Sequence, residues 1–232
     1  MGLLSIYHFY CIIKFHLNNY NYNLKELYSI NKMDNLKTGD LIFFTGHKTG
    51  CLKYFSSMIE YSTHSNYSHV AMVLKDPTYI NPNLKGLYVW ESGLEGKPDP
   101  QDGSIKLGVQ LTPLQEILDN FTEAKAILRT VKCDDTHFTA EQLKGIHEVV
   151  YKKPYDIVPL DWINALFRKD KKQQKTDRFW CSALVGYIYV ECGIIDPKTD
   201  WSIMRPSDLS LDGDNLKYIN GCSLSNEEIK IN

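Results

Sequence analysis

The chain has 232 residues, enough for one domain with a sizeable core, and its apolar fraction of 43% is ordinary for a globular protein. The formal net charge is -2, so the chain lacks the basic surface of nucleic-acid-binding proteins and no nucleic-acid partner is expected. Six widely spaced cysteines indicate free thiols, as in intracellular proteins. The sequence contains no CxxC or HxxxH pair, so a structural zinc site is not expected.

The first 32 residues are predicted to be an extension of the folded domain. Residues 3–17 are apolar and aromatic, but His8, Lys14 and His16 interrupt them, so the stretch is too short and too polar to span a membrane. A poorly packed extension is the favoured interpretation, and a helix in weak contact with a membrane is the alternative. The predicted organisation is an extension at residues 1–32, a domain at residues 33–220 and a polar tail at residues 221–232.

Short apolar runs alternate with turn residues along the rest of the chain and predict an α+β protein. Strands are predicted at residues 41–44, 69–74, 87–91, 109–111 and 126–131. Helices are predicted at residues 52–61, 113–120, 139–151, 162–167 and 179–192. Thr139 and Gln142 form a capping-box pattern before one helix, and Gly193 is typical of a C-cap after another. We expect a solvated loop at residues 168–175 and a frayed chain end.

Cys181 stands near the start of the last predicted helix, in the sequence FWCSALV. A helix N-terminus offers free N–H groups and a positive dipole end, and both favour a thiolate over a thiol. The same N–H groups can bind the oxyanion that forms when a thiolate attacks a carbonyl. On this feature alone a buried structural thiol remains the alternative.

His69 is the histidine that a catalytic thiol could use as its base. It lies at the beginning of a predicted strand, and a histidine there can face a helix N-terminus as in papain-type enzymes. The alternative is a surface histidine whose ring bonds to Ser68 or water.

Glu91 is the candidate that would orient the His69 ring. If Leu74 and Leu87 flank the hairpin loop, antiparallel pairing brings His69 alongside Glu91 or Ser92. A shift of one residue in the register would turn Glu91 to the other face of the sheet, so a solvated glutamate at a strand end stays open.

Five short segments stand out by their order and spacing: residues 36–43 (LKTGDLIF), 67–73 (YSHVAMV), 90–92 (WES), 154–156 (PYD) and 180–185 (WCSALV). Together they resemble the permuted papain-like branch of the NlpC clan. The resemblance is closest to its YiiX-type and poxvirus members, and lecithin:retinol acyltransferase belongs to the wider group. It extends over roughly residues 36–209 and includes a PSDL segment at residues 206–209.

This resemblance implies a circularly permuted papain-like (NlpC-type) fold, in which a small antiparallel β-sheet or barrel packs against helices. It implies Cys181 as nucleophile, His69 as base and Glu91 as orienting residue. Tyr155 and Asp156 match a recurring pair near the site, and Tyr67 is a candidate side-chain donor to the oxyanion. The expected location is intracellular: the cytoplasm of a eukaryotic or virus-infected cell, or a virion.

The predicted function is that of a cysteine-dependent hydrolase or acyltransferase acting on an amide or ester bond through a Cys181 thioacyl intermediate. The resemblance implies three substrate classes: a peptide or isopeptide bond, an amide in cell-wall-like material, or a lipid ester or amide. No metal or organic cofactor is required. The alternative is a catalytically silent binding protein, or a virion or scaffold protein, that retains the fold.

Overall fold

The computed structural model describes residues 33, 35–45, 67–120, 125–156, 176–213 and 215–231. The chain divides into two compact units, Met1–Leu36 and Lys37–Asn232. In the first unit the amide of Leu36 donates to the carbonyl of Met33 (3.1 Å). Every element named below belongs to the second unit. The predicted extension at residues 1–32, the helices at 52–61 and 162–167 and the loop at 168–175 lie outside the described residues.

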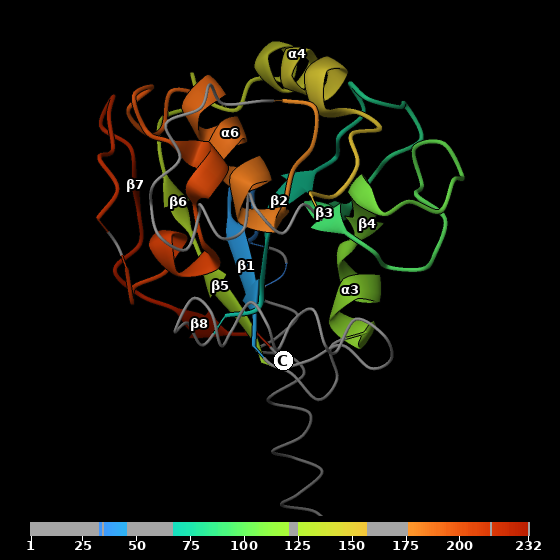
Figure 1. The fold of residues 1–232 in the computed structure, drawn as a ribbon, viewed down its shortest axis with the longest axis horizontal. Helices are drawn as coiled ribbons and strands as arrows, with labels where there is room; N and C mark the ends of the chain where they lie inside the picture. The colour runs from blue at the N-terminus through green and yellow to red at the C-terminus, as the bar shows by residue number, and fades with distance from the viewer. Residues whose placement is uncertain are drawn as a thin grey trace, which may run out of the picture. The chain divides into compact units, whose positions relative to one another are not determined.

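An antiparallel sheet of six strands forms the centre of the second unit (Figure 1). The strands lie in the order β4-β3-β2-β1-β5-β8, and each neighbouring pair is antiparallel. Their bounds are β1 Leu41–Phe44, β2 His69–Lys75, β3 Leu87–Gly93, β4 Gly108–Pro113, β5 Ala126–Arg129 and β8 Ile229–Lys230. A separate ladder pairs β6 (Val131–Lys132) with β7 (Ser223–Leu224). The predicted α+β class with an antiparallel sheet is confirmed.

The core lies on one face of this sheet. Side chains alternate between the two faces of a strand, so Leu41, Phe43, Val70, Met72 and Trp90 share a face. All five are fully buried and belong to one apolar cluster with residues of α6 (Cys181–Glu191) and α4 (Ala140–Val150). Figure 1 shows α6 lying across the sheet with α4 beside it. This packing fixes α6 relative to β2 and β3.

Helix α6 is buried along nearly its whole length, which explains why its sequence is apolar on every side. It begins at Cys181, two residues later than predicted, and Gly193 follows its C-cap with a positive φ of 70°, as the C-cap prediction requires. Gly186 lets the helix approach the turn η1 (Trp201–Ile203) closely. A Cβ atom at Gly186 would lie 2.4 Å from Met204 Sδ and 3.0 Å from Trp201 Cβ.

Two further helices and a turn accompany α6. Helix α4 carries the predicted capping box, in which the Thr139 side chain accepts from the Gln142 amide and the Gln142 side chain accepts from the Thr139 amide. Helix α3 (Leu114–Asn120) follows β4 directly, and the turn η2 (Pro206–Leu209) holds the PSDL segment. In the part of the chain that the structure describes, no helix has the length and apolarity to cross a membrane.

The expectation of a frayed end at residues 221–232 is wrong, because β7 and β8 both pair with other strands. The buried guanidinium of Arg129 donates to the carbonyl of Ser225 (2.9 Å). Glu228 accepts from the amide of Leu211 (2.8 Å) and from the hydroxyl of Tyr67. Polar composition suggested solvation, but the Ser225 carbonyl and the Glu228 carboxylate bond to other parts of the folded unit instead.

Candidate active site

Strands β2 and β3 stop pairing with each other close to the site. β2 and β3 pair from Lys75 and Leu87 to Met72 and Trp90, while β3 goes on pairing with β4 as far as Gly93. The segment that leads into α6 bonds to both strands beyond that point. The amide of Val70 in β2 bonds to the sulfur of Cys181, and the hydroxyl of Ser92 in β3 donates to the carbonyl of Phe179 (2.7 Å).

Cys181 is the first residue of α6, and it is buried. Its sulfur accepts from the amides of Val70 and Ser182 and bonds to the ring of His69. Burial alone raises the pKa of the Cys181 thiol, but the charge and hydrogen bond of His69 and these two amides lower it below its ordinary value. The site therefore stabilises a thiolate at Cys181.

Neighbouring residues fix the start of α6. The hydroxyl of Ser182 (2.7 Å) and the indole of Trp180 (3.0 Å) both donate to the carbonyl of Met204. The amide of Phe179 donates to the carbonyl of Pro154 (3.1 Å). These bonds fix the residues on both sides of Cys181.

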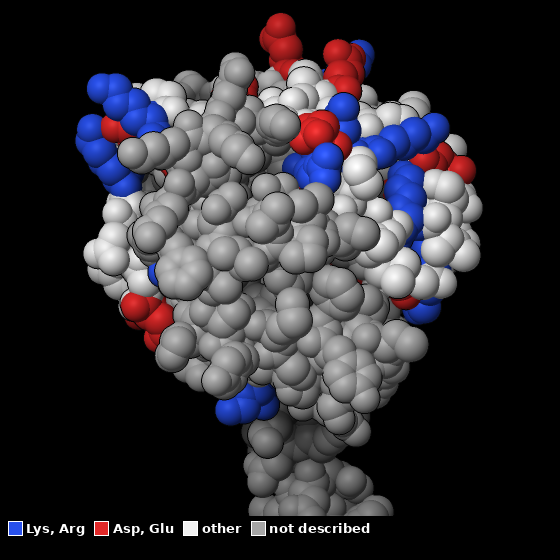
Figure 2. Space-filling view, viewed as in Figure 1, with Lys and Arg blue, Asp and Glu red and all other residues white. Residues whose placement is uncertain are grey.

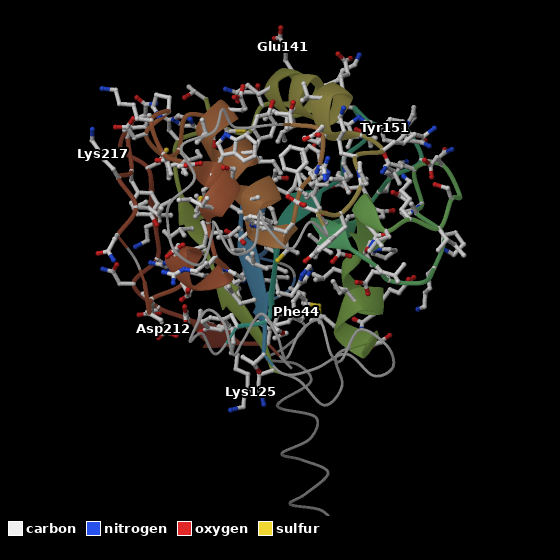
Figure 3. All side chains as sticks on the ribbon, viewed as in Figure 1. Phe44, Lys125, Glu141, Tyr151, Asp212 and Lys217 are labelled. Atoms are coloured by element: carbon white, nitrogen blue, oxygen red, sulfur yellow. The ribbon has the colours of Figure 1, made fainter. Side chains whose placement is uncertain are left out.

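His69 joins the thiol to a carboxylate. Its Nε2 lies 2.7 Å from Glu91 Oε2, which leaves Nδ1 as the ring nitrogen available to the sulfur of Cys181. Burial alone lowers the pKa of His69, but the charge and hydrogen bond of Cys181 and the interactions with Glu91 outweigh it and raise the pKa to about 10. The ring also contacts Phe44, which Figure 3 places at the end of β1, at a centroid distance of 5.9 Å. His69 is thus held as an imidazolium beside a thiolate.

Glu91 is fully buried in β3, so its charge is screened little by water. One oxygen, Oε2, bonds to His69, and the other, Oε1, accepts from the hydroxyl of Thr112 in β4 (2.6 Å). β4 pairs Gln110 directly with Glu91, which places Thr112 at a diagonal position on the same face. The carboxylate is therefore oriented from two neighbouring strands.

Gly93 leaves room for this arrangement. A Cβ atom at Gly93 would lie 3.3 Å from Glu91 Oε2 and 3.6 Å from His69 Cε1. Any larger residue would crowd the Glu91 and His69 side chains and disturb the hydrogen bond between them. The sequence pattern WES at residues 90–92 ended one residue before this position.

The remaining predicted residues lie in two places. The peptide at Tyr155 bridges to Phe179, and the amide of buried Asp156 donates to the Phe179 carbonyl (3.1 Å). Burial, together with the charges of Cys181 and Asp156, raises the pKa of Tyr155 well above its usual value, so Tyr155 lies near Cys181 as a neutral phenol. The Tyr67 hydroxyl instead donates a hydrogen bond to the carboxylate of Glu228. Its role as a hydrogen-bond donor to the oxyanion stays a prediction.

Sequence reasoning missed four contributors to the site: Val70, Gly93, Gln110 and Thr112. Val70 acts through its amide, which no side-chain pattern reveals. Gln110 lies inside the strand predicted at residues 109–111, and Thr112 lies one residue past its predicted end, so the polar alternation of a slightly longer strand would have indicated both. The Nε2 atom of Gln110 is buried without a hydrogen-bond partner, on the face that Glu91 also occupies.

Charge is mixed among the described residues on the face that Figure 2 draws. Figure 2 shows Lys and Arg side chains interspersed with Asp and Glu around the rim of the face it draws. Among the described residues, no group of three or more His, Cys, Asp and Glu side chains is arranged to hold a metal ion.

Comparisons with known proteins found similarity among solved structures. No family model matches the chain. No curated protein matches it either. The crystal structure of metalloprotein YiiX from Escherichia coli O157:H7 is similar at 18% sequence identity, over 82% of this chain and 97% of that chain, with a TM-score of 0.41. A likeness of this degree leaves the activity of the chain to be argued from its own site.

Proposed function

We propose that the chain is a cysteine-dependent hydrolase or acyltransferase that cleaves an amide or ester bond through a thioacyl intermediate on Cys181. The observation that carries the proposal is that the ring of His69 bonds both to Glu91 and to Cys181, the first residue of α6. The order of base, carboxylate and nucleophile along the chain supports assignment to the permuted papain-like (NlpC-type) fold, with YiiX-type, poxvirus and lecithin:retinol acyltransferase proteins as relatives.

The first half of the cycle transfers the acyl group to sulfur. The Cys181 thiolate attacks the substrate carbonyl, and a carbon–sulfur bond forms as the carbonyl oxygen takes up negative charge. The amide of Cys181, the first residue of α6, would donate to this oxyanion. His69 then gives its proton to the leaving amine or alcohol as the carbon–heteroatom bond breaks.

The second half returns the enzyme to its starting state. Neutral His69 takes a proton from water, or from an acceptor hydroxyl or amine, and the oxygen or nitrogen attacks the thioester. The carbon–sulfur bond breaks, and the thiolate is again paired with the imidazolium. Buried Glu91 keeps the ring in one orientation through both halves.

The surroundings of the sulfur favour an acyl donor with an apolar part. Tyr155 lies near Cys181 as a neutral phenol, and half-buried Trp180 precedes the nucleophile. Aromatic side chains bind acyl chains and apolar peptide side chains by contact area. Peptide, isopeptide and lipid acyl bonds are accordingly the substrate classes to test, in an intracellular setting.

The direct test is to trap the thioacyl intermediate. The purified chain is mixed with p-nitrophenyl butyrate, and intact and peptide mass spectra are recorded within seconds and after longer incubation. We expect one butyryl group on the peptide that contains Cys181, released on longer incubation. The Cys181→Ser variant should lose the adduct, and the matched control Cys192→Ser, another buried helix-end thiol, should keep it. No adduct, or labelling spread evenly over the cysteines, would favour a silent binding or scaffold protein.

A further inference from the structure

Two cysteines that take no part in the proposed chemistry lie opposite each other at the C-terminal ladder. β6 and β7 pair Val131 with Leu224 and Lys132 with Ser223. The next pair in the same register is Cys133 and Cys222. Thr130 and Ser225, just before this ladder, lie in the same register, because the amide of Ser225 donates to the carbonyl of Thr130 (2.8 Å).

The hydrogen bonds of the ladder show which kind of pair this is. In antiparallel strands, pairs that exchange hydrogen bonds alternate with pairs that do not. The amide of Val131 donates to Asp40 and that of Cys222 to Ile219, so neither points across the ladder. Cys133 and Cys222 therefore form a pair without exchanged hydrogen bonds. Such pairs bring their Cα atoms to about 4.5 Å, inside the range of about 4.4–6.8 Å that a disulfide spans.

The two thiols already interact in the reduced protein, where both cysteines are free. Burial raises the pKa of Cys133 to about 12, together with a hydrogen bond to Cys222 and the charge of that residue. The side chains thus point toward each other. Cys133 is partly exposed and Cys222 is buried, so a small oxidant can reach the pair from the Cys133 side.

We propose that Cys133 and Cys222 form a reversible disulfide that fastens the C-terminal segment, residues 215–231, to β6 when the protein meets a hydroperoxide. One thiolate of the pair attacks the peroxide, a sulfur–oxygen bond forms, the oxygen–oxygen bond breaks, and hydroxide leaves. The second thiol then attacks this sulfenic acid, the sulfur–sulfur bond forms, and the oxygen leaves as water after taking up a proton. With hydrogen peroxide, two thiols and one peroxide give one disulfide and two waters.

The consequence concerns the end of the chain that carries Glu228. A bond between Cys133 and Cys222 closes a loop of about 90 residues, and cross-links across long loops restrict the unfolded chain most. It would hold β7, β8 and Glu228 in place without a change in the register already present. The high pKa of Cys133 makes the pair a slower target for peroxide than Cys181, so the two oxidations separate in time.

The experiment uses the full chain, as wild type and as Cys181→Ala. Each is incubated with hydrogen peroxide, quenched with catalase and alkylated, digested without reductant, and mapped by mass spectrometry. Melting is followed in parallel, before and after added dithiothreitol. We expect a peptide linked through Cys133 and Cys222 in both proteins, a Tm raised by on the order of 5–10 °C, and reversal by the reductant.

The matched variants are Cys133→Ser and Cys192→Ser. The first should lose both the linked peptide and the rise in Tm, and the second should keep both. Amide exchange of residues 222–231 should slow on oxidation of the wild type, a readout that needs no variant to fold. The proposal is overturned by no linked peptide, by linkage of either cysteine to a different one, or by a linked protein whose Tm and exchange are unchanged.

Discussion

At the scale of single residues, the charge on His69 depends on two anionic partners, Cys181 and Glu91. Burial opposes that charge, and the two partners together outweigh burial to raise the pKa of His69 to about 10. The same ion pair lowers the pKa of Cys181. Because the two groups titrate as a pair, a change at Glu91 must appear at the sulfur as well.

Glu91→Gln tests this coupling while keeping the size of the side chain. Loss of the buried negative charge lowers the pKa of His69 and weakens the pair, so the pKa of Cys181 rises. We expect the pH range of activity to narrow from both sides, with turnover at neutral pH lower by roughly 10–100-fold. The measurement is the pH profile of ester hydrolysis. Glu116→Gln, on the partly exposed salt bridge with Lys97, is the control, and an unchanged profile in Glu91→Gln contradicts the assignment.

Gly93→Ala tests whether free space beside the pair matters. The added methyl group meets Glu91 Oε2 at 3.3 Å and His69 Cε1 at 3.6 Å, so the carboxylate must shift by a few tenths of an ångström. We expect slower alkylation of Cys181 at pH 7 with little loss of Tm. The control Gly145→Ala adds a methyl group to α4 where no atom lies within 4 Å, and it should stabilise the protein by about 0.5–1 kcal/mol. Equal alkylation rates in the two variants would argue against the role of Gly93.

At the scale of elements, the register between β2 and β3 is the feature of the site that the sequence left open. The residue types and helix position identified Cys181 and His69, because strand ends and helix starts follow from local patterns. The observed register pairs Leu74 with Tyr88, one residue away from the predicted pairing with Leu87. The predicted pairing of Leu74 with Leu87 would place Ser92 on the same face of the sheet as His69. The observed register places Glu91 on that face instead. A long loop does not fix register, so the sequence alone left both open.

The end of the chain was mispredicted for a related reason. Residues 221–232 are polar and lack a strong alternating pattern, which is typical of a frayed tail. Their partners are distant in the sequence: β8 pairs with β5, and Ser225 accepts from Arg129. Contacts of this kind depend on the assembled sheet, so no local pattern predicts them.

Helix α6 begins with the proposed nucleophile, so the packing of α6 against η1 is a second test at the scale of elements. A methyl group at Gly186 would lie 2.4 Å from Met204 Sδ and 3.0 Å from Trp201 Cβ, so the Met204 side chain must move and Trp201 of η1 must give way slightly. We expect Gly186→Ala to lower the free energy of unfolding by about 1–3 kcal/mol in a urea titration, although alanine is the better helix former. An increase in the free energy of unfolding would mean that α6 does not pack closely against η1 at Gly186.

At the scale of the whole molecule, Arg129 ties three distant parts of the chain together. It is fully buried in β5 and donates to the carbonyls of Ser225 (2.9 Å) and Leu209 (2.7 Å). Arg129→Met keeps much of the volume but removes both donors, and each buried carbonyl left without one costs about 1–3 kcal/mol. We expect a loss of about 2–5 kcal/mol in unfolding free energy. Arg178→Met, at a half-exposed site, should change it by less than about 0.5 kcal/mol, and equal effects would contradict the account.

The measurement that tests the central claim most directly is the pH dependence of Cys181 alkylation by iodoacetamide, mapped by mass spectrometry in wild type and His69→Ala. The account predicts fast labelling of Cys181 well below the ordinary thiol pKa of about 8.5, with onset returning toward that value in the variant. Buried Cys192, whose pKa burial raises to about 12, should stay slow in both proteins. Labelling of Cys181 that follows an ordinary thiol and ignores the loss of His69 would contradict the ion pair, and with it the proposed catalysis.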